Sequence, residues 1–129
     1  MPDSNNNAPA RLIYACSGVA NTGYLADQIA RRFHREGVGT MTCLAAMGAR
    51  HKRFLNDARS AGQNVLIDGC PISCGKAIFT ELDIPYIHFM TTDFDVEKGK
   101  TPITEQVIER VKSTIRDLLN SAEKVKSAS

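Results

Sequence analysis

Four short apolar runs, each followed by a segment with helical patterning, constrain the fold of this chain more than any other feature. The runs occupy residues 11–16, 40–44, 65–68 and 86–90. They carry apolar side chains on both faces, which is typical of parallel strands that helices cover on both sides. With right-handed crossovers, the alternation predicts an α/β three-layer sandwich around a short four-stranded parallel sheet, of flavodoxin-like or Rossmann-like type.

The segments between these runs predict the helices. The first helix ends at Gly37, which suits a left-handed C-terminal cap. A basic helix is predicted over residues 48–61 and a short one over residues 71–82. The last helix begins at residues 101–102, and apolar side chains repeat along one of its faces over four turns. This stripe consists of Ile103, Val107, Val111, Ile115, Leu118 and Leu119.

Length and composition indicate one domain. Of the 129 residues, 43% are hydrophobic and 23% are charged, which is the balance of a globular chain with a core of its own. We expect residues 11–120 to form this single domain. The polar residues 1–10 are expected to be a disordered leader, and residues 121–129 a flexible tail.

Charge and aromatic content exclude two classes of partner. A net charge of +2 is too small to predict binding to nucleic acid or to a membrane surface, and there is no Trp for base stacking. No apolar run is long enough to span a bilayer, and the Asn-rich start of the chain shows no secretory signal. We therefore expect a cytoplasmic protein with no nucleic-acid or membrane partner, in which cysteines stay reduced.

The cysteines all lie near the carboxyl ends of predicted strands, at Cys16, Cys43, Cys70 and Cys74. In the strand order 2-1-3-4 the first three strands are neighbours, about 4.8 Å apart, and their ends share the edge where such folds bind ligands. The order 3-2-1-4 would hold Cys70 one strand farther from Cys16, so convergence favours the first order. Four thiolates form a closed tetrahedral zinc site, and an iron–sulfur cluster uses the same ligand set. Cys43 alone is equally well explained as a small buried apolar residue.

The stretch from Asp68 to Lys76 also allows a redox chemistry. If its helix begins at Pro71, Cys70 and Cys74 lie one turn apart on one face. The positive end of the helix dipole would then lower their pKa and make Cys70 the more activated thiol. The usual exchange motif has two intervening residues rather than three, so this signal is the weaker one.

Three further side chains are expected near these cysteines. Asp68 either caps the turn or accepts a hydrogen bond that orients the cysteine loop, and Lys76 offsets thiolate charge. His88 is either a satisfied core histidine, a spare ligand or a donor to a ligand. The basic run at residues 50–53 follows Cys43, and is either a solvated helix face or a surface that attracts an anion or acidic partner.

The motif Asp68-Gly69-Cys70, followed by Cys74-Gly75-Lys76, resembles the DGC-type zinc-binding protein family, which is named for its Asp-Gly-Cys motif. Proteins of that family are small, mostly prokaryotic, and carry four cysteines. By resemblance these correspond to Cys16, Cys43, Cys70 and Cys74, and the similarity covers roughly residues 11–119. The resemblance implies zinc binding and brings no reaction with it.

Together, these observations predict a zinc-binding protein with one metal ion as its partner, which acts in metal handling or sensing. The alternative is a thiol redox or sulfur-transfer enzyme that uses Cys70 and Cys74.

Overall fold

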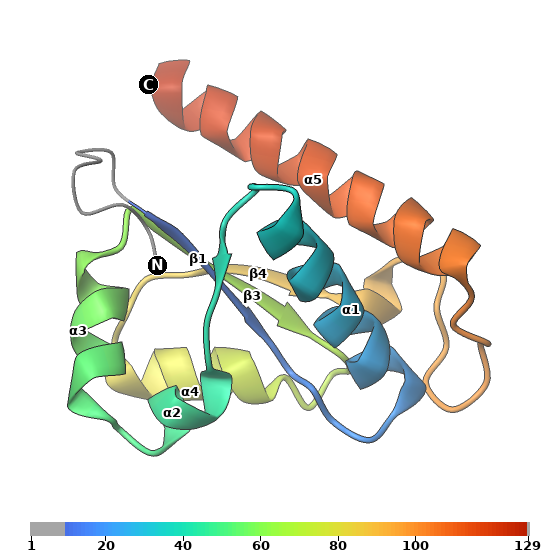
Figure 1. The fold of residues 1–129 in the computed structure, drawn as a ribbon, viewed down its shortest axis with the longest axis horizontal. Helices are drawn as coiled ribbons and strands as arrows, with labels where there is room; N and C mark the ends of the chain where they lie inside the picture. Colours follow the sequence, from blue (N-terminus) through green and yellow to red (C-terminus); the bar gives the residue numbers. More distant parts are fainter. Residues whose placement is uncertain (1–9, 129) are drawn as a thin grey trace.

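A parallel sheet of four strands forms the centre of the protein (Figure 1). The computed structural model describes residues 10–128, and side chains over residues 10–121. The strands lie in the order β2-β1-β3-β4. Their bounds are Arg11–Ala15 for β1, Thr40–Met41 for β2, Gln63–Asp68 for β3 and Ile87–Met90 for β4. The predicted fold class and strand order are therefore confirmed.

Helices cover both faces of this sheet, which gives the three layers of the sandwich (Figure 1). One face packs on α1 and α5, and the other on α2, α3 and α4. The helices are α1 (Asn21–Arg35), α2 (Leu44–Gly48), α3 (Lys52–Ser60), α4 (Cys74–Leu82) and α5 (Glu105–Ala128), and a 3-10 turn, η1, spans Thr91–Asp93.

Alternation along the strands divides the core into two clusters. Ile13 of β1 points to α1 and α5, whereas Tyr14 points to α4, where its ring meets Phe79 edge to face at 4.9 Å between centroids. Successive side chains of a strand point to opposite faces, so one apolar strand supplies both clusters. These clusters hold the sheet together independently of the cysteines.

The basic helix predicted over residues 48–61 begins later than predicted, because α3 spans Lys52–Ser60 and a separate short helix, α2, ends at Gly48. Arg50 adopts a left-handed conformation with φ of 59°. The N–H groups of Arg50 and His51 donate to the carbonyls of Met47 and Ala46 at 3.1 and 3.0 Å, which closes α2 before α3 begins. Met47 is fully buried against the sheet, so α2 is fixed by packing that its short apolar pattern did not reveal.

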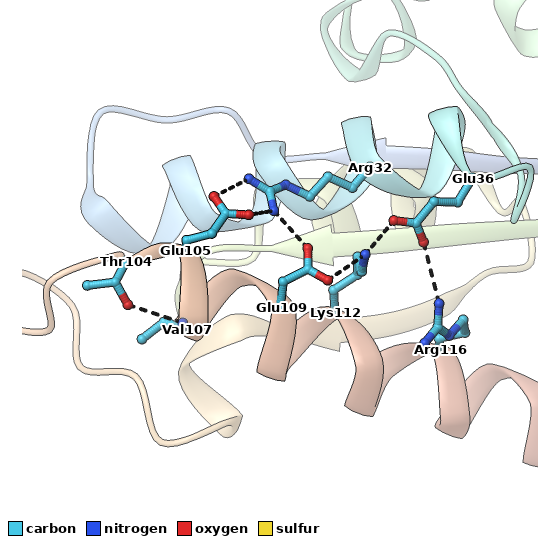
Figure 2. A network of polar contacts seen from close by, with 8 residues as sticks. All are labelled: Arg32, Glu36, Thr104, Glu105, Val107, Glu109, Lys112 and Arg116. Atoms are coloured by element: carbon cyan, nitrogen blue, oxygen red, sulfur yellow. Dashed lines mark hydrogen bonds and ion pairs between the residues drawn. The ribbon is translucent and has the colours of Figure 1, made fainter.

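An ion-pair network joins α1 to α5 (Figure 2). Arg32 of α1 binds Glu105 and Glu109 of α5, the latter at 2.7 Å. Lys112 of α5, only 4% exposed, binds Glu109 at 2.9 Å and also binds Glu36. Although burial acts in the opposite direction, these carboxylates raise the pKa of Lys112, so its ammonium stays charged.

The ends of the chain were predicted to be a leader and a tail. The leader, residues 1–10, lies outside the described residues except for Ala10. Helix α5 continues to Ala128, through most of the segment 121–129, whose flexibility stays a prediction. Within residues 10–128, no helix combines the length and the apolar character that a membrane crossing requires.

Candidate functional site

Cys16 follows β1 at the carboxyl edge of the sheet. Its N–H donates to the carbonyl of Ile67 in β3 at 3.0 Å, so the backbone on which the thiol is mounted is tied to the neighbouring strand. The side chain is half-buried, and its Sγ lies over Gly18, where a Cβ atom would be 3.6 Å from the sulfur. The loop after β1 therefore curls around this thiol.

Cys43 lies at the same edge of the sheet, after β2, which flanks β1 on the side opposite to β3. The N–H of Thr42 donates to the carbonyl of Ile13 at 2.9 Å, which continues the pairing of β2 with β1. Cys43 is the N-cap residue of α2 and is exposed. The reading of Cys43 as a buried apolar residue is therefore wrong.

Cys70 and Cys74 lie on a turn that precedes α4. The prediction that α4 begins at Pro71 is wrong, because the helix begins at Cys74 and Ser73 has a left-handed φ of 50°. The N–H of Ser73 donates to the carbonyl of Cys70 at 2.9 Å, which closes the turn. Cys70 and Cys74 are therefore not one turn apart on one face of a helix, the arrangement that was expected if the helix began at Pro71.

The glycine of the Asp-Gly-Cys motif brings the two cysteine loops together. A Cβ atom on Gly69 would lie 2.7 Å from Cα and N of Gly23 in the first turn of α1. A Cβ atom on Gly23 would in turn lie 2.9 Å from the carbonyl oxygen of Gly18, in the Cys16 loop. Only residues without side chains permit this stacking of backbones, which places the turn before Cys70 against the loop after Cys16.

Asp68 caps α4 from the end of β3, as one of the two sequence interpretations predicted. Its buried carboxylate accepts the N–H groups of Gly75 and Lys76 at 2.9 and 3.1 Å, and His88 Nε2 lies 2.8 Å from Oδ2. A carboxylate at a helix N-terminus is favoured by the dipole and by the unpaired N–H groups of the first turn. His88 is therefore a donor to the residue that orients the cysteine loop.

The electrostatics of Cys74 differ from the prediction. The pKa of this thiol is raised, first by its desolvation although the residue as a whole is exposed, and then by the charges of Cys16, Asp68 and Cys70. The predicted lowering is therefore wrong for Cys74, because desolvation and the neighbouring negative charges outweigh the backbone hydrogen bond at Cys74, which lowers the pKa. Of these neighbours, Cys16 and Cys70 belong to the two loops that the contact of Gly69 with Gly23 brings together.

The side chains of the site are not gathered as a finished ligand set. Over the described part of the chain, no three His, Cys, Asp or Glu side chains are grouped so that they could hold a metal ion. The donors are nevertheless of the right kind, because thiolates are the ligands that zinc prefers in closed sites.

Three residues shape this site although no sequence pattern indicates their role in it. Lys98 Nζ donates to Cys70 Sγ at 3.6 Å, from a connection that carries no motif. The buried hydroxyl of Thr91 lies 3.1 Å from the carbonyl oxygen of Thr22 and 3.3 Å from that of Gly69, and so links the two loops. Asn21 holds the Lys98 segment through its side chain, which bonds to Glu97, Gly99 and Thr101. These contacts span 22 to 80 residues of sequence, so local patterns do not reveal them.

Comparison with known proteins agrees with this arrangement. The family described as DGC domain matches residues 12–115. The Anaerobic and virulence modulator AnvM of Pseudomonas aeruginosa is 32% identical over 99 residues, which are 76% of this chain and 76% of AnvM. No solved structure matches the chain. The match over most of the domain, with the Asp-Gly-Cys motif at the loop junction, shows that this chain belongs to the DGC-domain family.

Proposed function

We propose that this protein binds one zinc ion through Cys16, Cys43, Cys70 and Cys74, and that it acts in metal handling or sensing rather than in catalysis. The observation that carries the proposal is the close packing of Gly69 on Gly23, which sets the turn that bears Cys70 and Cys74 against the loop after Cys16 at one edge of the sheet. Cys43 follows the adjacent strand at this edge. Membership of the DGC-domain family supports metal binding.

The surroundings suit a site that carries negative charge. Four thiolates around one divalent ion leave a net negative centre, which nearby positive groups must offset. Lys98 already contacts Cys70, and Lys76 lies in the first turn of α4. Metal ligands bind as thiolates, so a cation that replaces the proton of Cys74 would also offset the negative charges that surround this thiol.

Binding would be coupled to movement of the cysteine loops, because the thiols are not yet grouped around a centre. Zinc bonds to sulfur at about 2.3 Å, so the ion would draw the loops after β1, β2 and β3 together. Coupling of this kind suits a protein that reports or passes on a metal. The name of AnvM, a modulator, agrees with a regulatory role.

Metal analysis tests the proposal. Protein purified anaerobically without chelator is expected to contain about one equivalent of zinc per chain. Thiol titration should detect few reactive cysteines before metal removal and all four afterwards. If the protein instead contains iron and acid-labile sulfide, the site is an iron–sulfur cluster and the zinc assignment is wrong. Four freely titrating thiols with no metal would overturn metal binding altogether.

Chelation is expected to lower the melting temperature without unfolding the sheet. The two apolar clusters contain none of the four cysteines, so the fold does not depend on the ion as a zinc finger does. Far-UV circular dichroism at 25 °C should therefore stay nearly unchanged after chelation, while thermal scans show an earlier transition. Complete loss of the dichroism signal would contradict the self-sufficient core.

A thiol redox or sulfur-transfer enzyme is the second candidate. It is favoured by the contact of the Lys98 ammonium with Cys70 Sγ at 3.6 Å, since a cation beside a thiol is a feature of reactive cysteines. The raised pKa of Cys74 acts against it, since a protonated thiol is a poor nucleophile. Reversible formation of a Cys70–Cys74 disulfide in metal-free protein, with turnover of a disulfide or persulfide substrate, would favour this candidate over zinc binding.

A further inference from the structure

The carboxylate of Asp68 is buried, and the surrounding fold supplies hydrogen-bond donors to it. Its side chain is only 1% exposed. A buried carboxylate is costly unless hydrogen-bond donors surround it. Asp68 has three: the N–H groups of Gly75 and Lys76, and the ring of His88. The two backbone donors belong to α4, and the third comes from β4.

His88 is the side chain that completes this arrangement. In the register of β3 with β4, His88 pairs with Leu66, so it lies on the same face of the sheet as Asp68 and diagonal to it. Its Nε2 lies 2.8 Å from Asp68 Oδ2. Because an ionised carboxylate can only accept, Nε2 carries the hydrogen and donates it.

The first turn of α4 depends on this carboxylate for its position. Ser73 occupies the N-cap place but does not cap the helix, because its hydroxyl donates to the carbonyl of Cys70 at 3.2 Å. Asp68 takes over that role by binding the two residues that follow Cys74. A Cβ atom on Gly75 would lie 3.0 Å from Asp68 Oδ1, so the helix end fits closely against the carboxylate.

We propose that His88 is a positioning residue of the thiol site: by holding the carboxylate of Asp68, it fixes Cys74 relative to Cys16 and Cys70. His88 does not touch the ion; it acts through Asp68 and the first turn of α4. The inference deepens the proposed function and rests on it for its metal readout, whereas its thiol readout is independent of metal.

The test compares two substitutions at one position. His88→Leu removes the donor, whereas His88→Gln keeps one, because the Gln amide nitrogen lies the same number of bonds from Cβ as Nε2. We expect His88→Leu to weaken zinc affinity about 10–100-fold in a chelator competition, which is the usual cost of losing an outer-shell partner. His88→Gln should recover most of this loss.

The second readout is alkylation of the metal-free protein by iodoacetamide, followed at each cysteine by mass spectrometry. A loosened helix end should expose Cys74, so His88→Leu should speed its alkylation by roughly threefold or more. The alkylation rate at Cys43, the N-cap residue of α2, should not change. His88→Gln should again behave like the unmodified protein.

His34→Leu is the matched control. It also removes an imidazole hydrogen bond, from the N–H of Met41 to His34 Nδ1, but at the end of α1 remote from α4. It is expected to lower the melting temperature slightly and to leave the Cys74 alkylation rate unchanged; zinc affinity is not part of this control, because Met41 lies two residues before Cys43.

Three outcomes would overturn the inference: equal effects of His88→Leu and His88→Gln, no effect of His88→Leu on the Cys74 rate, or the same effect on the Cys74 rate in His34→Leu. If the unmodified protein takes up no zinc, the proposed function fails, and the alkylation rates at Cys74 still decide the role of His88.

Discussion

Serine in place of any one of the four cysteines is expected to reduce zinc affinity more than about 100-fold, because each substitution removes a soft ligand and not merely an outer-shell contact. The variants are Cys16→Ser, Cys43→Ser, Cys70→Ser and Cys74→Ser. Each should keep the fold, since none of these side chains belongs to either apolar cluster. Competition with a chromophoric chelator measures the affinities, and circular dichroism checks the fold.

Cys43→Ser is the most decisive of these variants. Its thiol is exposed, and it follows β2 rather than either of the two loops that Gly69 and Gly23 bring together, so the four-cysteine assignment depends on it most. Full affinity in Cys43→Ser would show that this assignment is wrong. If only Cys70→Ser and Cys74→Ser altered behaviour, a redox pair would replace the single metal site.

Ser17→Ala controls for disturbance of the Cys16 loop. The hydroxyl of Ser17 donates to Asp27 at 2.8 Å on the exposed surface, without contact to a thiol. This variant should retain the zinc affinity of the unmodified protein.

Gly69→Ala is expected to have the largest effect on folding. The new methyl group would lie 2.7 Å from backbone atoms of Gly23, and backbone cannot rotate away as a flexible side chain can. Overpacking of this kind costs about 1–3 kcal/mol or somewhat more, and we expect the upper end. Urea denaturation measures the loss. Zinc binding should weaken as well, because the two cysteine loops must separate to admit the methyl group.

Gly48→Ala is the matched control for this prediction. At the end of α2, a Cβ atom would lie 3.4 Å from Cδ1 of Ile78, which is close to an ordinary contact with a side-chain end. We expect a change within about 0.5 kcal/mol, since alanine also favours the helix. A loss as large as that of Gly69→Ala would mean that glycine in general, rather than the contact with Gly23, matters here.

The sheet and its cysteine edge could be predicted because they follow from patterns inside short segments. The central strands β1 and β3 are buried apolar runs flanked by the partly buried β2 and β4, and parallel strands align their carboxyl ends. This is why Cys16 and Cys43 lie at one edge, and why Asp68 ends β3 directly before the turn to Cys70. The strand order 2-1-3-4 could be predicted as well, because it places the strands that end at Cys16 and Cys70 side by side.

The start of α4 could not be predicted, because it depends on a contact across the fold. Pro71 suits the first helical position by propensity, yet the helix starts three residues later, after a left-handed Ser73, where the carboxylate of Asp68 accepts the N–H groups of Gly75 and Lys76. The break at Arg50 has a similar origin, in the burial of Met47 against the sheet. Tertiary contacts override local preference at these two places, and both adjoin cysteine-bearing segments.

The ion pairs between α1 and α5 have a consequence for the order of folding. They link residues that are 73 to 80 positions apart, from Arg32 with Glu105 to Glu36 with Arg116. Closing so long a loop is entropically costly and slows folding. During synthesis, β1 and α1 leave the ribosome early but acquire their partner helix only when the last part of the chain emerges. The part of α1 that packs on α5 is therefore expected to stay uncovered until the end of translation, which makes the nascent protein prone to aggregate at that stage.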